Sequence, residues 1–367
     1  MFERDDNLQD RKYNFELLRI FAAIAVISIH VSSSYMEAYT SSDWLGFKYR
    51  EHILVSCMFE LIPRFAVPSF LMLSGTFVLE DKKNADFKYY YEKVFRKIGI
   101  PSIVICATYV FCNVWLQIIE MVRNGGDGKG VLNVLISAII GKPFYHIWYI
   151  YMMLGVYLLI PIVIRFKKDI GENSFIKVTI IFFISAILGL WTSEHNIQWD
   201  PGLSFCYLSY CMVGYIIRKR IQKINIKAIF LFFLGFGILI FSSLLKYILI
   251  VEGLDHSIYS RYLLSPFCPV QVLASIFVFA GFAKLEFRVD VTAISKLTFE
   301  IYLFHAGIWE MLKKIVTIEM DSRIVIVLMI ILVFVLSMIV SVLYKKIWNK
   351  IEEKWMLTDR ICKIVGF

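Results

Sequence analysis

Apolar runs of around 20 residues, each long enough to cross a bilayer as an α-helix, recur along the whole chain. The composition agrees with them: 59% of the residues are hydrophobic and 19% are charged, whereas a soluble protein is nearer half apolar and a quarter charged. A soluble domain with a single anchor is therefore excluded. We expect an all-α fold, a polytopic membrane helical bundle of about ten transmembrane helices.

The positive charges between the apolar runs predict the orientation of this bundle. With residues near span ends counted in the adjoining loop, one side receives about three times as many lysines and arginines as the other. By the positive-inside rule the richer side is cytoplasmic, and it holds both termini. The net charge of +9 is thus a signal of topology, and we expect no nucleic-acid partner. The predicted spans are 15–36, 52–79, 99–121, 145–165, 175–192, 203–218, 228–250, 263–284, 295–315 and 323–345.

Two regions are predicted along the chain. Residues 1–345 form the membrane domain, and 346–367 form a cytoplasmic amphipathic tail. The sequence contains no glycine-rich phosphate loop, zinc signature or Gly-x-Ser-x-Gly elbow, and its seven cysteines show no metal spacing. We expect no metal and no tightly bound cofactor, so any chemistry takes place within the membrane bundle or at its surfaces.

The first span, Asn14 to Tyr35, contains three ionisable residues, Glu16, Arg19 and His30. The eleven steps from Arg19 to His30 equal three helical turns plus about 20°, so these two side chains share a face and lie about 16 Å apart along the axis. Glu16 falls near the same stripe. Charged groups at membrane depth cost roughly 2.5–3.5 kcal/mol each even on lenient scales, so they usually face protein or water. This span is therefore a candidate functional site.

Charged residues also occur inside the second and seventh spans. Glu60 and Arg64 are four residues apart, which favours an intrahelical ion pair, while a role for Arg64 in holding an anionic or carbonyl ligand is equally open. Pro63 and Pro68 predict a break or kink in the second span. Lys246 lies near the outer end of the seventh span, where we expect its side chain to snorkel to the interface.

The strongest basic segment lies between the second and third spans. Lys93 and Arg96 are one helical turn apart there, so they can grip a phosphorylated ligand from the cytosol through charge-assisted hydrogen bonds. The alternative is ordinary positive-inside charge in contact with anionic membrane lipids. Both interpretations stay open.

Aromatic residues open the fourth span from the outside. His146, Trp148 and Tyr149 belong to the stretch GKPFYHIWYIYMM, and His146 and Tyr149 are one turn apart. Such aromatics are typical of an interfacial belt. Rings beside a hydrogen-bonding histidine also suit a sugar.

The ninth span, SKLTFEIYLFHAGIWEML, resembles the first in one respect. It starts at the cytoplasmic face and places His305 about ten residues in, so His305 and His30 are predicted at similar depth in two helices of the same direction. Two histidines at one level indicate a shared polar cavity. Glu300 is about 140° around the helix from His305 and should not share its face.

Over nearly its whole length the chain resembles the acyltransferase-3 family of bacterial integral-membrane O-acyltransferases. The main match is an arginine followed, after ten residues, by a histidine in the first span: Arg19 and His30. KPFYHIWY is most similar to the branch containing the enterobacterial common antigen O-acetyltransferase. Further matches are RFAVPSFLMLSG (64–75), FYHIWYIYMMLGVYLLIP (144–161) and SKLTFEIYLFH (295–305).

The resemblance implies transfer of an acetyl group from cytosolic acetyl-CoA to a hydroxyl of a cell-surface or lipid-linked glycan at the bacterial cytoplasmic membrane. It implies His30 as the general base, because a histidine can take the proton of an attacking hydroxyl. The other residues implied are Glu16 and Arg19 for orientation and donor binding, Lys93, Arg96 and Arg64 for the donor, and His305, His146, Trp148 and Tyr149 for the acceptor or cavity.

Three positions depart from the family pattern. Glu16 stands where the family often has aspartate, and Glu300 where a small residue is usual. Lys93 replaces the first arginine of an Arg-x-x-Arg pair, and lysine lacks the bidentate fork of arginine.

Two other functions fit parts of the sequence. Buried charges and prolines within spans also describe a glycan exporter, although no inverted repeat is evident. A protein that binds acetyl-CoA without turning it over is the third interpretation.

Overall fold

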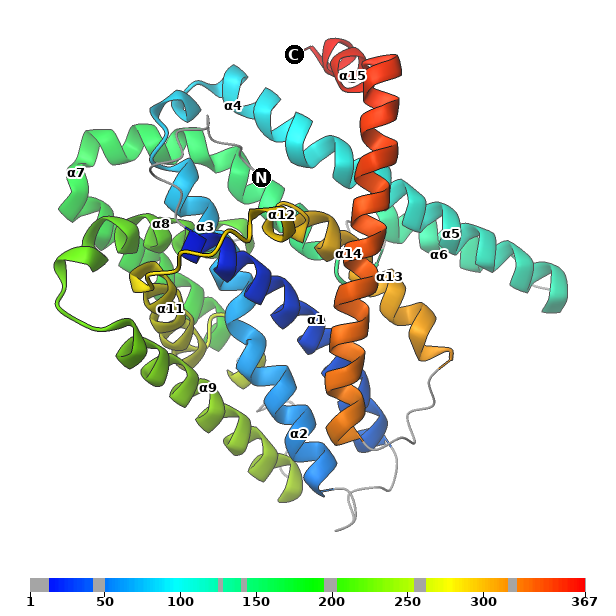
Figure 1. The fold of residues 1–367 in the computed structure, drawn as a ribbon, viewed down its shortest axis with the longest axis horizontal. Helices are drawn as coiled ribbons and strands as arrows, with labels where there is room; N and C mark the ends of the chain where they lie inside the picture. Colours follow the sequence, from blue (N-terminus) through cyan, green and yellow to red (C-terminus); the bar gives the residue numbers. More distant parts are fainter. Residues whose placement is uncertain are drawn as a thin grey trace. The chain divides into compact units, whose positions relative to one another are not determined.

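The computed structural model describes residues 13–41, 50–124, 128–139, 144–194, 203–253, 262–315 and 322–366. Within these ranges the chain is helical and has no β-strand, so the predicted all-α fold is confirmed (Figure 1). The described residues form two compact units. The larger unit comprises 13–81 and 169–345, and the smaller unit comprises 82–168 and 346–366.

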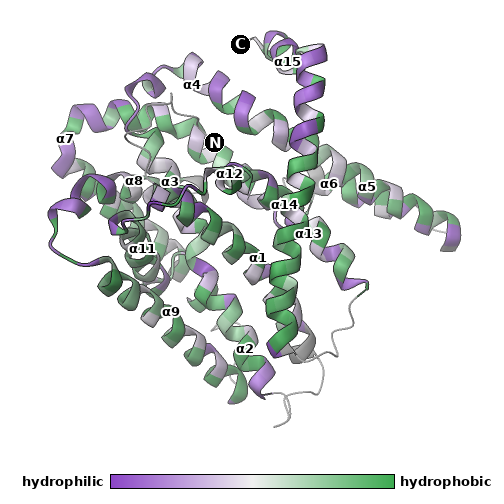
Figure 2. Cartoon of the chain, viewed as in Figure 1, coloured by the Kyte–Doolittle hydropathy of each residue, from purple (hydrophilic) through white to green (hydrophobic). Residues whose placement is uncertain are grey.

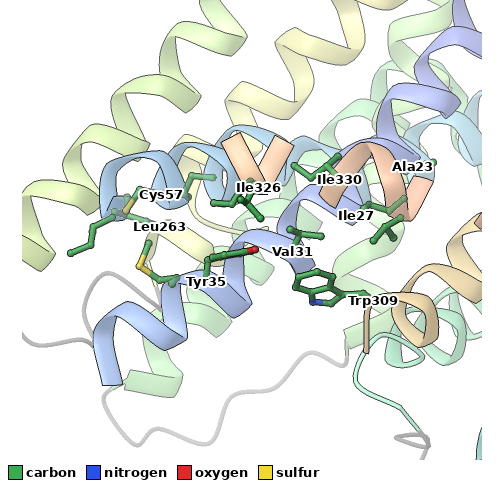
Figure 3. Packing of buried hydrophobic residues seen from close by; sticks show 14 of the residues in the cluster. Ala23, Ile27, Val31, Tyr35, Cys57, Leu263, Trp309, Ile326 and Ile330 are labelled. Carbon is green, nitrogen blue, oxygen red and sulfur yellow. The ribbon is translucent and has the colours of Figure 1, made fainter. Parts of the chain in front are cut away.

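Helix α1 (Tyr13–Ser41) is the helix around which the larger unit packs. It contacts α2 (Arg50–Leu61), α3 (Ala66–Val78) and α13 (Thr298–Lys313). Its buried stripe repeats every fourth residue, the spacing of one helix face. Figure 3 shows this stripe meeting side chains of neighbouring helices: Ala23, Ile27, Val31 and Tyr35 pack with Cys57, Leu263, Trp309, Ile326 and Ile330.

The second predicted span is broken, as its prolines predict. Between α2 and α3 lies a four-residue 3₁₀ segment, η3 (Ile62–Phe65), with a proline at its start. Proline lacks the N–H that continues an α-helix, so the hydrogen-bonding pattern changes at this point. Arg64 lies within η3, and η3 packs against α1.

Two glycines bring α3 and α8 (Leu203–Arg220) into backbone contact. A Cβ on Gly75 would lie 1.8 Å from the carbonyl oxygen of Cys211, and one on Gly214 would lie 2.0 Å from that of Met72. Glycines at such crossings let helices approach closely in a membrane, where packing drives association. These helices fix the position of the segment that carries Arg64.

The remaining helices of the larger unit surround these elements, and α9 packs closely against α11 and α2. Figure 2 shows α9 and the first part of α14 as mainly hydrophobic, whereas the last turns of α14 are hydrophilic. The helices are α9 (Ala228–Val251), α11 (Pro269–Lys284), α12 (Thr292–Ser295) and α14 (Ser322–Trp355).

The smaller unit is built from the segment that follows α3 and from the C-terminal end of the chain. A π-helical turn, η5, joins α4 to α5. The end of α14 leads into α15 through Met356, which has φ 45°. Its other elements are η4 (Lys82–Ala85), α4 (Phe87–Val94), η5 (Phe95–Gly99), α5 (Ile100–Asn124), α6 (Lys129–Ile139), the first part of α7 (Trp148–Glu194) and α15 (Leu357–Val365).

Seven helices of the described chain are long and apolar enough to cross a membrane, so the protein is a multi-pass membrane protein. The predicted count of ten is not confirmed. Helix α7 extends over both the fourth and fifth predicted spans and breaks at Gly171, whose φ of 73° no α-helix adopts. Helix α13 occupies the ninth span with 16 residues, fewer than the roughly 20 that a spanning helix needs.

Candidate active site

The two histidines of the first and ninth predicted spans meet in the larger unit. The ring centroids of His30 on α1 and His305 on α13 are 5.3 Å apart, with 34° between the ring planes. His305 is completely buried, while His30 is half-buried. The two histidines were predicted to lie at similar depth, and in the structure their rings are in direct contact.

The backbone of α13 fixes the orientation of the His305 ring. Its Nδ1 lies 2.6 Å from the carbonyl oxygen of Tyr302. A carbonyl oxygen only accepts, so the proton of a neutral His305 sits on Nδ1 and the lone pair on Nε2. That lone pair makes Nε2 a positioned acceptor or base within the bundle.

Three serine hydroxyls fix α1 on either side of His30. Ser28 Oγ donates to the carbonyl oxygen of Phe59 at 2.7 Å, and Ser33 Oγ donates to a Glu60 carboxylate oxygen at 3.3 Å. On the other face, Ser34 Oγ accepts from Trp309 Nε1 at 3.1 Å. These bonds hold the helix bearing His30 to both α2 and α13.

An ionic cluster lies beside this region. Arg64 Nη2 is 3.2 Å from Glu60 Oε1, which confirms the predicted ion pair. The other oxygen of Glu60 pairs with Lys246. The prediction that Lys246 snorkels is wrong, because its side chain is only 2% exposed and α9 packs against α2. The sequence does carry a signal for this: Lys246 continues a helix face that begins with Leu239 and Ser242.

Glu16 and Arg19 form a second polar cluster nearer the start of α1. Arg19 Nη1 lies 2.8 Å from Glu16 Oε1, and Ser295 donates a hydrogen bond to the other oxygen of Glu16. The guanidinium of Arg19 also lies 5.4 Å from the centre of the Phe77 ring. Glutamate at position 16 therefore holds Arg19 and contacts α12.

Arg218 is a member of this cluster that the sequence alone did not single out. Its guanidinium lies 5.2 Å from the centre of the same Phe77 ring. It pairs with Glu80 at 2.7 Å and donates to the carbonyl oxygen of Thr76 at 3.1 Å. Arg218 begins a run of basic residues at the end of the sixth predicted span, and the positive-inside rule already explains such a run.

In the smaller unit, Lys93 and Arg96 contact different groups. Lys93 Nζ donates to Asn84 Oδ1 at 3.3 Å. Arg96 pairs with Glu92 at 2.9 Å and with Asp359 of α15. Arg96 lies in the π turn η5, whose wider winding changes its angle relative to Lys93.

His146 is enclosed by aromatic rings in the smaller unit. The rings of Tyr109 and Phe144 each lie 5.5 Å from the imidazole, which is buried. Trp148 and Tyr149 contact each other edge to face, with 6.2 Å between their centroids. Tyr109, on α5, is a member of this cluster that sequence spacing could not reveal.

The predicted site residues divide between the units. The larger unit holds Glu16, Arg19, His30, Arg64 and His305. The smaller unit holds Lys93, Arg96, His146, Trp148 and Tyr149. Among the residues that the structure describes, no three histidine, cysteine, aspartate or glutamate side chains gather as a metal site would require.

Residues 12–345 match the family model of the acyltransferase-3 family, which is described as an acyltransferase domain. The chain belongs to the acyltransferase-3 family. The prediction that the protein is an enzyme is therefore confirmed: it is an acyltransferase. The matched region includes both His30 and His305. Curated proteins and solved structures give no match to it.

The larger unit of this acyltransferase combines the groups that acyl transfer needs. A neutral imidazole can remove a proton from a hydroxyl. A cationic guanidinium can stabilise negative charge that develops on a carbonyl oxygen. His30 and His305 are imidazoles, and Arg64 is a guanidinium, in this unit.

Proposed function

We propose that this acyltransferase moves an acetyl group from cytosolic acetyl-CoA to a hydroxyl of a cell-surface or lipid-linked glycan. The contact between His30 and His305, 5.3 Å between ring centroids, is the observation that carries the proposal. It supplies a pair of imidazoles inside a helical bundle whose family transfers acyl groups. The enzyme resides in the bacterial cytoplasmic membrane, with ten spans and both termini in the cytosol.

His30 acts as the general base. It takes the proton of the acceptor hydroxyl as the oxygen attacks the thioester carbonyl, a contribution of typically about 10²- to 10⁴-fold. His305, its ring held by the Tyr302 carbonyl, orients His30 or the acceptor. Family membership and the ring contact support this assignment.

The donor lies along α1. Arg19 and His30 are about 16 Å apart on a straight helix, so one ligand must extend between them. Acetyl-CoA is long enough, with its charged end toward Glu16 and Arg19 and its acetyl end toward His30. Lys93 and Arg96 bind its phosphates, and Arg64 contacts the thioester.

The acceptor enters from the outside past the aromatic cluster of the smaller unit. Trp148 and Tyr149 offer ring faces and His146 offers hydrogen-bonding capacity. The similarity of KPFYHIWY to the enterobacterial common antigen branch favours a glycan of the cell envelope as acceptor. Membrane lipids surround the bundle and present a lipid-linked acceptor.

Glycan export without acyl transfer is the second candidate function. Ionisable groups within a helical bundle are also typical of transport pathways, and here Glu60 and Lys246 are buried while Arg64 is partly exposed.

One experiment separates the two functions. Membranes containing the protein are given acetyl-CoA labelled in the acetyl group, and label in the glycan fraction is measured. The acyltransferase proposal predicts label that depends on the protein, and mass spectrometry of the glycan then shows the increment of one acetyl group. Glycan that reaches the cell surface without any label would instead support export.

A further inference from the structure

A hydrogen bond joins α1 to α13 one helical turn beyond the two histidines. Trp309 Nε1 donates to Ser34 Oγ at 3.1 Å. Ser34 follows His30 by four residues and Trp309 follows His305 by four, which in an α-helix is a rise of about 6 Å and a rotation of about 40° past a full turn. The bond therefore lies close to the histidine contact, on nearly the same side of each helix.

The Ser34 hydroxyl connects this bond to His30 itself. Ser34 Oγ accepts from Trp309 and donates to the carbonyl oxygen of His30 at 3.2 Å. A hydroxyl has one proton to donate and two lone pairs with which to accept, so it can make both contacts at once. Trp309 on α13 is thus linked through one serine to the backbone of the candidate base on α1.

The indole of Trp309 is held in place by its surroundings. Trp309 is 2% exposed, and its ring stacks on that of Tyr35 with 6.4 Å between the centroids and 29° between the planes. It packs in the same buried cluster as Val31 of α1 (Figure 3). An indole N–H is a donor only, and burying it without an acceptor is costly. The bond to Ser34 therefore restricts where this ring can sit along α1.

The contacts close a loop around the histidine pair. The rings of His30 and His305 meet at 5.3 Å between centroids. One turn further along both helices Trp309 meets Ser34, and Ser34 returns to the His30 backbone. Because both contacts join the same two helices, sliding or rotation of α13 along α1 would disturb them together. Apolar packing is non-directional, whereas a hydrogen bond requires its donor and acceptor at about 3 Å and a favourable angle.

We infer that Trp309 and Ser34 are positioning residues: their hydrogen bond sets the register of α13 on α1, and this register holds the His30 ring against His305 in the orientation that proton removal needs. The inference rests on the proposed function and names two residues that act through His30 rather than on the substrate. A general base must lie within hydrogen-bonding reach of the proton that it takes, and a misplacement of about 1 Å can cost roughly 100-fold in rate. A small change of register therefore lowers turnover.

The chemical step that this register serves is acetyl transfer. The acceptor oxygen forms a bond to the thioester carbon as His30 takes its proton, the C–S bond breaks, and the CoA sulfur receives that proton. The products are the acetyl ester and CoA with a free thiol. Neither Trp309 nor Ser34 gains or loses a proton in this step. We therefore expect both residues to affect turnover and the orientation of His30, and to leave the apparent KM for acetyl-CoA unchanged.

The test removes either end of the bond, as Trp309→Phe or Ser34→Ala, and then both ends. Turnover of labelled acetyl-CoA per folded molecule and the KM for acetyl-CoA are measured, together with the imidazole nitrogen NMR signals of His30, which His30→Ala identifies. Each single variant should lose about 10-fold in turnover at unchanged KM and should shift the His30 signals. Because both changes delete the same bond, the double variant should lie within about twofold of the less active single variant.

Ser34→Thr keeps a hydroxyl at this position and should keep wild-type turnover. Ser32→Ala is the matched control, because Ser32 Oγ donates to the Ser28 carbonyl oxygen of its own helix at 2.8 Å, and it should change neither turnover nor the His30 signals. Trp309→Phe with lowered thermal stability but wild-type turnover per folded molecule would overturn the inference, and so would unshifted His30 signals. An inactive wild-type protein would instead contradict the proposed function, and the His30 signals would still decide whether Trp309 and Ser34 position the ring.

Discussion

One basic cluster from each unit of the molecule shows two different ways of pairing cations with carboxylates. In the larger unit, Arg64 and Lys246 both pair with the carboxylate of Glu60, and the side chains of Glu60 and Lys246 are buried. In the smaller unit, Arg96 alone meets two carboxylates, those of Glu92 and Asp359, at a half-exposed position. The first arrangement joins α2, η3 and α9 among the packed helices. In the second arrangement, Glu92 and Asp359 neutralise the charge of Arg96, and a phosphate would have to compete with them for its guanidinium.

A tight helix crossing is a second feature of the larger unit. Backbone contacts at Gly75 and Gly214 hold α3 and α8 of the larger unit together. Helix α5 of the smaller unit exposes Phe111, Trp115 and Val122, residues suited to lipid, and α9 of the larger unit likewise exposes Phe233 and Phe241. We expect changes in the larger unit to affect folding and turnover, and changes in the smaller unit to affect the donor requirement.

The largest effect should come from Gly214→Val. Its new side chain would overlap the Met72 carbonyl, 2.0 Å from the Cβ position, so helices α3 and α8 must separate. We expect a loss of about 3 kcal/mol or more and little folded protein. Fluorescence-detected gel filtration in detergent measures it. Gly237→Ala is the control, because no described atom lies within 4 Å of its Cβ position, and normal folding of Gly214→Val would refute the tight crossing.

His305→Ala should come next. It removes the ring that contacts His30 while leaving the donor-binding residues intact. We expect turnover to fall by about 100-fold and the affinity for acetyl-CoA to stay the same. Steady-state kinetics with labelled acetyl-CoA separate the two quantities. If the variant instead bound acetyl-CoA more weakly and kept normal turnover, His305 would be assigned to the donor site.

Lys93→Ala combined with Arg96→Ala probes the smaller unit. Loss of charge-assisted bonds to donor phosphate should raise the apparent KM for acetyl-CoA about tenfold or more. Turnover at saturating donor should persist, in contrast to His305→Ala. An unchanged donor dependence would remove these two residues from the donor site.

Asp359→Asn should give the smallest effect, and in the opposite direction. Asp359 occupies the guanidinium of Arg96, so it competes with a donor phosphate. Because the pair is partly exposed, its removal should lower the apparent KM by about two- to fivefold. Glu286→Gln changes an exposed acid whose pair with Arg288 measures 4.0 Å, and it should have no effect. A raised KM in Asp359→Asn would mean that Asp359 positions Arg96 rather than competes for it.

Local features of the sequence predicted much of this molecule. Apolar runs predicted the helices, and Pro63 and Pro68 predicted the break that becomes η3. Equal depth in two parallel spans predicted that His30 and His305 lie at one level, because helical rise per residue is constant.

Contacts that depend on which helices pack together could not be predicted from local sequence patterns. Depth alone suggested that Lys246 snorkels, but the packing of α9 on α2 turns it toward Glu60. The contact between Arg96 and Asp359 joins positions 263 residues apart, beyond any local pattern. Arg218 was hidden within a basic run that the positive-inside rule already explained.

In the proposed mechanism, His30 removes the proton of the acceptor hydroxyl during acetyl transfer. The most direct measurement is incorporation of labelled acetyl from acetyl-CoA into the glycan fraction of membranes containing His30→Ala, normalised to folded protein. His52→Ala, a histidine on α2 with no assigned role, is the matched control. We expect His52→Ala to transfer acetyl at the wild-type rate and His30→Ala to lose about 10²- to 10⁴-fold in transfer. Wild-type transfer by His30→Ala would contradict it.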